Sequence, residues 1–441
     1  MDNVQIDRVE KIQVRAVNEP SAGVYSYKAG TPIVTFDLAS SNKFLRASTL
    51  RLNGKVKFLT GAGAALDNKG LKGGAATDVK ISPRVALNSI FQNVSIASGA
   101  TNMTIESVRQ YGRLVATLVP ATHGAQDLLQ QQGVVSMTTG VQDSTAVMMN
   151  NEMSFSLRIF AGLFNSSQAI PMGVSGMNGL TLTFELASDQ QVLSGADASS
   201  GTGASYQISD LSITADMLVP DAEGQQKLAI PGTSQFAYNT FQSLYSVISS
   251  SDATQTYNLA SSNVLSVFQN FLPVNHTNTY SQDGFATEML QNSTGDAILN
   301  KVSFSRSGVK LGLDYDLDVQ KQSEEGLPET GVMVNALNSI QPYFAISNMS
   351  HQPLLFPYGT SDKRIYDDAT QVFKTVDSGD RAFFIGLATD RVSEQGLDFR
   401  GMPYSTRIQS TLDQTQPNSV FTFYLTKNIL QTSQQGVAVV S

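Results

Sequence analysis

The sequence predicts an all-β protein that consists of two tandem halves. The chain has 441 residues, too many for one ordinary domain and about right for two or three. Apolar and polar residues alternate with a period of two in both halves, which is typical of half-buried strands. Each half also contains one segment with helical spacing, placed between its strands. A segment without periodicity that contains Pro220 and Pro231 separates the halves near the midpoint.

Six alternating runs predict strands in the first half. They cover residues 12–16, 34–38, 50–58, 90–96, 153–161 and 180–186. In the last run, Leu180, Leu182, Phe184 and Leu186 point one way, while the residues between them are polar. We therefore expect the first group to face a core.

The run 50–58 contains Asn53-Gly54, which is a strong hairpin signal. A two-residue turn there would place Leu52 opposite Lys55 and mix Leu with Lys on each face. A continuous strand instead keeps the apolar residues together, so we predict one strand with Gly54 at a bend or bulge.

The clearest strand of the second half is residues 309–319, where the odd positions are predicted to face a core and the even positions water. Val302 and Phe304 form its predicted hairpin partner, and Arg306-Ser307-Gly308 forms the turn. Further predicted strands are residues 383–387, 404–412, 421–425 and 437–439.

Two segments predict helices. Ile105, Val108, Tyr111, Gly112, Val115 and Leu118 follow helical spacing in the first half, as does the range 332–340 after Thr330 in the second. A short third candidate is residues 285–290.

Glycine, alanine and serine are concentrated in residues 61–77 and 194–205, which are predicted loops. The ranges 124–151 and 253–300 are expected to be large loops. The linker of 219–233 divides the chain into a first domain of residues 1–219, a connection of 220–233 and a second domain of 234–441.

Composition excludes several classes of protein. Charged residues make up 15% of the chain and the net charge is −8, which argues against electrostatic or sequence-specific binding of nucleic acid. The longest apolar run, residues 382–388, is too short to span a membrane. The first seventeen residues lack the pattern of a signal peptide. With no cysteine, disulfides and thiolate metal sites are impossible.

The sequence offers little catalytic chemistry. His123, His276 and His351 lie far apart, and none has a partner at metal-ligand spacing. The string Gly173-Val174-Ser175-Gly176-Met177 lacks the final glycine of a nucleophile elbow. Gly54-Lys55-Val56 lacks the other residues of a phosphate-binding loop. We therefore expect no catalytic residues, no cofactor, no small-molecule substrate and no enzyme activity.

Asp314, Asp316, Asp318 and Glu325 match positions one, three, five and twelve of a calcium-binding loop. Val319 occupies the sixth position, which normally requires glycine, and the same aspartates form the polar face of a predicted strand. A solvated acidic face is the preferred interpretation, and calcium on these aspartates stays an alternative. Six glycosylation sequons begin at Asn93, Asn102, Asn165, Asn275, Asn292 and Asn348, and without a signal peptide we infer no glycan.

Several segments, in their order along the chain, resemble the double jelly-roll major capsid proteins of adenovirus, tailless phages, large DNA viruses, virophages and Polinton-like viruses. The range 44–52 resembles an early strand of the first jelly roll, and 89–97 followed by 105–118 is similar to a strand that leads into a helix. The range 179–186 resembles a late strand. In the second half, 300–315 is similar to the hairpin before the helix, and 404–408 with 420–425 to the final hairpin.

The resemblance implies two tandem eight-stranded jelly rolls, each with a short helix, plus long loops. It also implies a homotrimer that forms a pseudo-hexagonal capsomer in the icosahedral capsid of a double-stranded DNA virus, with assembly in the infected host cell. Its implied partners are neighbouring capsomers, penton and minor capsid proteins, and an internal membrane. Residues 1–17 are expected at the inner face of the shell, as an arm or a first strand.

A β-sandwich adhesin or carbohydrate-binding protein of a virion or of the secreted class is the alternative function. Sugar sites commonly present aromatic platforms, and this chain has no tryptophan but has 14 tyrosines. The composition therefore disfavours this alternative and leaves it open.

Overall fold

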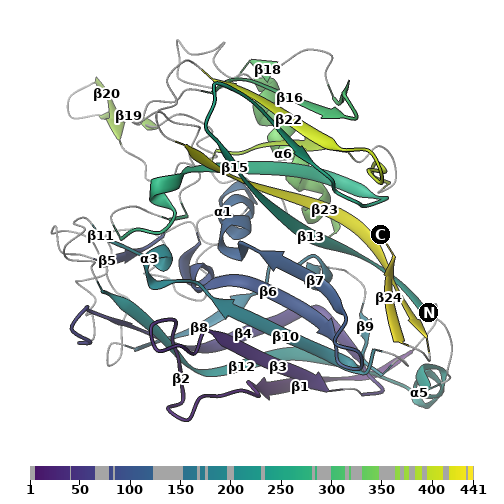
Figure 1. Ribbon diagram of the computed structural model, residues 1–441. Helices are drawn as coiled ribbons and strands as arrows, with labels where there is room; N and C mark the ends of the chain where they lie inside the picture. Colours follow the sequence, from purple (N-terminus) through teal and green to yellow (C-terminus); the bar gives the residue numbers. More distant parts are fainter. Residues whose placement is uncertain are drawn as a thin grey trace.

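The computed structural model describes residues 5–39, 41–64, 79–82, 85–122, 152–165, 169–173, 177–195, 203–229, 234–280, 284–285, 299–312, 317–318, 330–346, 363–367, 372–376, 383–389, 395–410, 417–433 and 436–440. Within these ranges it consists mainly of antiparallel sheets, as predicted. No sheet pairs a strand that precedes Pro220 with a strand that follows it. The first half fills the lower part of Figure 1 and the second half the upper part.

Two facing sheets form the first half. The larger has the order β1-β12-β4-β8, with β2 beside β12 and β9 beside β4, and the smaller has the order β3-β10-β6-β7. A short pair, β5 and β11, lies apart. The strands are β1 (Ile6–Arg15), β2 (Val24–Tyr25), β3 (Ile33–Ala39), β4 (Phe44–Leu59), β5 (Val79–Ile81), β6 (Phe91–Ser98), β7 (Thr104–Arg109), β8 (Glu152–Arg158), β9 (Ile170–Pro171), β10 (Gly179–Leu186), β11 (Leu193–Gly195) and β12 (Ser205–Pro220).

The second half repeats the plan. One sheet has the order β13-β23-β15-β21 with β24 beside β23, the other has the order β14-β22-β16-β17 with β18 beside β16, and β19 pairs with β20. The strands are β13 (Ser234–Ile248), β14 (Asp252–Tyr257), β15 (Val264–Pro273), β16 (Leu299–Arg306), β17 (Val309–Lys310), β18 (Leu317–Asp318), β19 (Lys363–Asp367), β20 (Val372–Val376), β21 (Ile385–Ala388), β22 (Tyr404–Ser410), β23 (Asn418–Ser433) and β24 (Gly436–Val440).

Helices are few in the described ranges. The α-helices are α1 (Tyr111–Thr122), α3 (Asp189–Val192), α5 (Ala222–Ala229) and α6 (Thr330–Ile346), and the 3₁₀ turns are η1 (Ala86–Ile90), η2 (Leu163–Asn165) and η3 (Val274–His276). Helix α1 lies between the two halves (Figure 1), and residues 111–118 of α1 are all buried. A helix that is buried on all sides belongs to a core rather than to a surface.

The alternating strands have the predicted faces. In β10, Leu180, Leu182, Phe184 and Leu186 are at most 2% exposed, and Glu185 is exposed. Strand β4 runs without a turn through Asn53-Gly54, which confirms the continuous strand.

A bulge lies opposite Gly54, on the neighbouring strand. Asp210 and Leu211 of β12 both lie opposite Gly54, between the register pairs Ser209–Lys55 and Ser212–Asn53, so β12 has one extra residue there. A Cβ atom on Gly54 would lie 2.5 Å from the Leu211 side chain, so only glycine leaves room for the bulged residue.

The predicted helix over residues 105–118 is wrong in its first part. Ile105 and Val108 lie in strand β7, and the helix begins at Tyr111 after Gln110, whose φ is 57°. Apolar residues three apart on a short strand therefore imitated a helical period. The second helix is confirmed, because α6 includes the predicted range 332–340. Of the third candidate, Phe285 lies in a turn and residues 286–290 lie outside the described residues.

The hairpin into β17 is confirmed, but the long strand of 309–319 is not. Strand β16 pairs with β17 across Ser307-Gly308, whose φ values of 49° and 80° suit a tight hairpin turn. The extended backbone then ends at Gly312, where φ is 79°. Val309 is 70% exposed, which contradicts its predicted place in a core, and β18 returns to β16 in a different register.

Two segments predicted as irregular contain regular structure. The expected large loop of 253–300 includes β15, in which all ten residues are buried. A strand buried on both faces has no alternation, so periodicity misses it. The expected linker of 219–233 contains α5, and β11 overlaps the start of the predicted loop of 194–205. The predicted loop residues 65–77 and 124–151 lie outside the described residues.

Candidate functional site

The residues that could have carried catalysis do not converge in the described structure. His276 lies in η3, while His123 and His351 fall outside the described ranges. Lys55 and its neighbours lie in the middle of β4 rather than in a loop. Within the ranges that the structure describes, no three His, Cys, Asp or Glu residues form a group that could hold a metal ion.

The proposed calcium ligands are mostly outside the described chain. Asp314, Asp316 and Glu325 lie in undescribed segments, and Asp318 lies in β18 opposite Lys301. Val174, Ser175 and Gly176 of the serine string also lie outside.

Four of the six sequons fall on described residues. Asn93 lies in β6 and its amide donates to Glu185, Asn102 lies in a turn with φ of 53°, and Asn275 lies in η3. Asn165 is 4% exposed. Asn292 and Asn348 lie outside the described residues.

The chemically distinctive region is the seam between the two halves, defined here as the contacts of β7, α1 and η2 with β13, β15 and α6. Glu106 of β7 lies at its centre and is 3% exposed. The Glu106 carboxylate accepts backbone hydrogen bonds from Gly162 and Leu163 at 2.8 Å and from Phe241 of β13 at 2.9 Å. One carboxylate therefore binds three backbone donors from both halves.

The environment of Glu106 acts on its pKa in two directions. Burial raises the pKa of Glu106 from its ordinary value of 4.5 to about 7, while the three backbone hydrogen bonds lower it. Tyr238 and Tyr343 are the neighbouring titratable groups, and burial raises the pKa of both. Both phenols therefore stay neutral beside the carboxylate.

Backbone atoms of the two halves approach each other closely at Gly162. A Cβ atom on Gly162 would lie 2.2 Å from the carbonyl oxygen of Asn239 in β13. Such a contact cannot be relieved by turning a side chain, because the obstructing atom belongs to the backbone. Gly162 therefore lets β13 approach the turn that carries two of the donors to Glu106.

Asn165 connects η2 to helix α6. The Asn165 side chain donates to the carbonyl oxygen of Tyr343 at 2.7 Å and accepts from the Arg158 guanidinium at 2.7 Å. The Tyr343 ring packs on Phe241 with centroids 4.8 Å apart. The polar contact therefore joins η2 to α6, and the aromatic contact joins α6 to β13.

Helix α1 inserts a buried cation into the second half. Arg113 is 1% exposed, and its guanidinium carbon lies 4.7 Å from the ring centroid of Phe421 and 5.9 Å from that of Phe285. Asn270 of β15 donates to Thr117 of α1 at 2.7 Å. Buried apolar residues from both halves belong to one continuous core. Together these contacts fix the two halves relative to each other.

The sequence gives no signal for this seam. Glu106 lies in the stretch 103–108, and the helical interpretation of that stretch hid its role.

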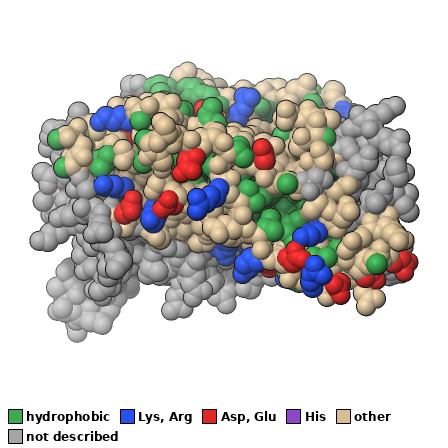
Figure 2. Space-filling model, turned by 90° about the horizontal axis from the view of Figure 1, so that it is seen from below, with side chains coloured by type: hydrophobic (Ala, Val, Ile, Leu, Met, Phe, Trp, Pro, Cys, Tyr) green, Lys and Arg blue, Asp and Glu red, His purple; other side chains and the backbone are tan. Residues whose placement is uncertain are grey.

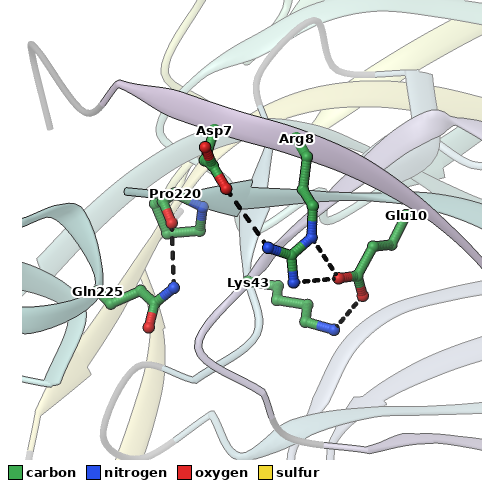
Figure 3. A network of polar contacts seen from close by, with 6 residues as sticks. All are labelled: Asp7, Arg8, Glu10, Lys43, Pro220 and Gln225. Carbon is green, nitrogen blue, oxygen red and sulfur yellow. Dashed lines mark hydrogen bonds and ion pairs between the residues drawn. The ribbon is translucent and has the colours of Figure 1, made fainter. Parts of the chain in front are cut away.

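The outer surface near the N-terminus has a different character. Figure 2, viewed from below, shows acidic and basic side chains interspersed with one another among hydrophobic side chains and other atoms. At strand β1, Arg8 pairs with Glu10 at 2.8 Å and with Asp7 at 3.4 Å, and Lys43 also pairs with Glu10 (Figure 3). These pairs are solvent-exposed or half-exposed, so each adds little to stability.

No protein-family model matches the chain, and no curated protein matches it. Solved structures do match it over nearly the full length of both chains. VP54 of the virus PBCV-1 matches with a TM-score of 0.58 at 12% identity, covering 100% of this chain and 98% of VP54. The Faustovirus major capsid protein matches with a TM-score of 0.58 at 9% identity, covering 98% and 92%.

The chain folds as a double jelly roll. The mavirus major capsid protein also matches it, with a TM-score of 0.50 at 9% identity and coverage of 97% of this chain and 89% of that protein. The two main sheets of each half are the facing layers of one jelly roll, and the seam joins the two rolls. Among the described helices, none is long and apolar enough to span a membrane.

Proposed function

We propose that this double jelly roll is the major capsid protein of an icosahedral double-stranded DNA virus and resides in the virion. The supporting observation is the superposition of both jelly rolls, over nearly the whole chain, on solved structures that include the Faustovirus and mavirus major capsid proteins. A match that spans two domains constrains their relative placement as well as their folds. The proposed role is structural, with no substrate and no catalytic step.

The proposed working unit is a homotrimer whose six jelly rolls form a pseudo-hexagonal capsomer. A fixed arrangement of the two jelly rolls suits this role, because a hinge between them would let their positions in the hexagonal capsomer vary. The seam around Glu106, Gly162 and Asn165 supplies the rigid connection. A chain with 15% charged residues, whose surface has both signs interspersed, suits dense packing of identical copies (Figure 2).

We further propose that residues 1–219 and 234–441 are the two jelly rolls and that 220–233 joins them. Neighbouring capsomers, penton and minor capsid proteins and an internal membrane are the proposed partners. The first seventeen residues contribute strand β1 and are proposed to lie toward the inside of the shell.

Negative-stain electron microscopy of the purified protein tests the proposed function. We expect class averages of three-lobed particles with a hexagonal outline. A uniform population of single two-domain particles would contradict the capsomer, and micromolar binding of a glycan by such particles would favour the adhesin alternative.

A further inference from the structure

Strand β1 forms an open edge of the larger sheet of the first jelly roll. It pairs with β12 from Ile6 to Arg15, with a register irregularity at Asp7 between Ile6 and Arg8, and no described strand pairs with its other side. The backbone N–H of Asp216 in β12 donates to Thr49 of β4 at 2.9 Å, so the hydrogen-bonding groups of Asp216 face β4. Because the hydrogen-bonding groups of successive residues point to alternate sides of a strand, the backbone groups of Met217 face β1, toward those of its register partner Glu10.

It follows from the same alternation that the hydrogen-bonding groups of Val9 and Lys11 face outward from the sheet. These two residues therefore present backbone donors and acceptors to a further strand. The Val9 side chain is 55% exposed. An exposed edge of this kind is a template for pairing with another chain.

An apolar row leads across the outer face of the sheet to this edge. Val9 is the register partner of Leu218, Leu218 of Phe44, and Phe44 of Pro171. Phe44 and Leu218 form a small apolar cluster separate from the main core. The apolar row ends at the solvent-exposed side chain of Val9, and an apolar residue on a neighbouring strand would extend the row.

The charges around Val9 specify which strand can pair there. Asp7, Arg8, Glu10 and Lys11 are symmetric in position and opposite in sign about Val9. In an antiparallel pair of two β1 strands with Val9 opposite Val9, Arg8 lies opposite Glu10 and Asp7 opposite Lys11. Opposite charges across a strand pair stabilise it, and like charges destabilise it.

Other registers of the same pair are unfavourable. A slip of one residue places Arg8 opposite Lys11 or Asp7 opposite Glu10, depending on its direction. A slip of two residues places Glu10 opposite Glu10 or Arg8 opposite Arg8. A parallel pair in register sets like charges side by side throughout. One register alone is therefore both charge-matched and centred on the apolar row.

We propose that β1 pairs with β1 of a second copy of this chain, antiparallel and around a two-fold axis at Val9. The pairing joins the two larger sheets into one continuous sheet and extends the apolar row through Val9 of both copies. A two-fold contact of this type is self-complementary. It differs from any three-fold contact within a trimer, so it would join copies that belong to different capsomers. That assignment to neighbouring capsomers rests on the proposed function, whereas the pairing itself does not.

Disulfide trapping tests the pairing directly, because the chain contains no cysteine. In the proposed register, Val9→Cys brings two Cα atoms to about 5.5 Å, which suits a disulfide. Gln13→Cys is the matched control, since Gln13 is also exposed on β1 but lies about 27 Å from its symmetry mate. Under mild oxidation of concentrated protein, we expect the Val9→Cys chain to form covalent dimers at least about tenfold faster than the control. Equal rates for the two variants would overturn the proposal.

Charge reversal in the Val9→Cys background tests the register. Lys11→Glu places like charges opposite each other at two symmetry-related positions, so we expect the dimer yield to fall about tenfold. Adding Asp7→Lys restores opposite signs and should restore the yield. If neither substitution changes the dimer yield, the proposed register is wrong. The native mass of the wild-type protein distinguishes the β1 pairing from the proposed capsomer. If trimers form but Val9→Cys is not trapped as a dimer, only the β1 pairing is refuted. If Val9→Cys is trapped but no trimer forms, only the capsomer is refuted.

Discussion

The carboxylate of Glu106, on strand β7 of the first jelly roll, accepts a hydrogen bond at 2.9 Å from the backbone N–H of Phe241, on strand β13 of the second. The same carboxylate accepts from Gly162 and Leu163 at 2.8 Å. A buried acid that satisfies three backbone donors is costly to alter, because every change leaves donors without acceptors. Glu106 is therefore one of the side chains that fix the relative placement of the two jelly rolls.

The pH dependence of stability is expected to report on Glu106. Burial raises the pKa of Glu106 in the folded protein to about 7, above its ordinary value of 4.5. A group whose pKa is raised on folding stabilises the fold fully below its unfolded pKa, and this contribution is lost as the pH rises through the folded pKa. The shift corresponds to about 3 kcal/mol of unfolding free energy, lost between about pH 4.5 and pH 7.

Urea unfolding at a series of pH values measures this loss. Glu106→Gln removes the titration, so its stability should lack this fall with pH, although the variant is less stable than the wild type at acid pH because its amide N–H₂ faces backbone donors. Glu185→Gln, at an exposed acid of β10, is the control and should follow the wild type. Parallel curves for the wild type and Glu106→Gln would refute the role of Glu106 burial.

Gly162→Ala should separate the two jelly rolls locally and lower the unfolding midpoint. The added Cβ atom would lie 2.2 Å from a backbone oxygen of β13, so the strand must shift, at a cost of about 2 kcal/mol or more. Gly63→Ala is the control, because Gly63 has a φ of 83° but no atom within 4 Å of the added Cβ. It measures backbone strain alone, about 1 kcal/mol. Because Gly162 itself has no positive φ, a loss near zero in Gly162→Ala would show that the close approach at the seam has no cost.

Asn165→Asp should destabilise the contact between η2 and α6 in a pH-dependent way. The change replaces an N–H donor by a carboxylate oxygen that faces the Tyr343 carbonyl oxygen, while the other oxygen still accepts from Arg158, and the expected loss is about 1–3 kcal/mol at neutral pH. At acid pH the introduced carboxyl group is protonated and donates again, so the loss should shrink. Thermal unfolding at pH 4 and pH 7 measures both values. Asn102→Asp, in an exposed turn, is the control and should show neither effect. A loss of stability in Asn165→Asp that does not change with pH would contradict the role of the hydrogen bond.

The sequence predicted β10, which has one solvent-facing side, and missed β15, which has none. Leu180 to Leu186 alternate because β10 is buried on one side only, whereas β15 is buried on both and gives no period. The start of the first helix was predicted wrongly because Ile105 and Val108 on β7 have the same spacing as the helix residues that follow.

The seam was not predictable from local patterns, because it joins residues far apart in sequence. Glu106, Gly162 and Phe241 meet only after both jelly rolls have formed. The resemblance to capsid proteins predicted the double jelly roll, which the solved structures confirm. It carried no information on which side chains fix the two rolls together.

Native mass spectrometry over a dilution series is the sharpest test that this pair of jelly rolls associates with copies of itself. We expect a species at three times the chain mass of 47.3 kDa that persists on dilution, as for an obligate interface larger than about 2,000 Å². A species at 47.3 kDa throughout the series would contradict it.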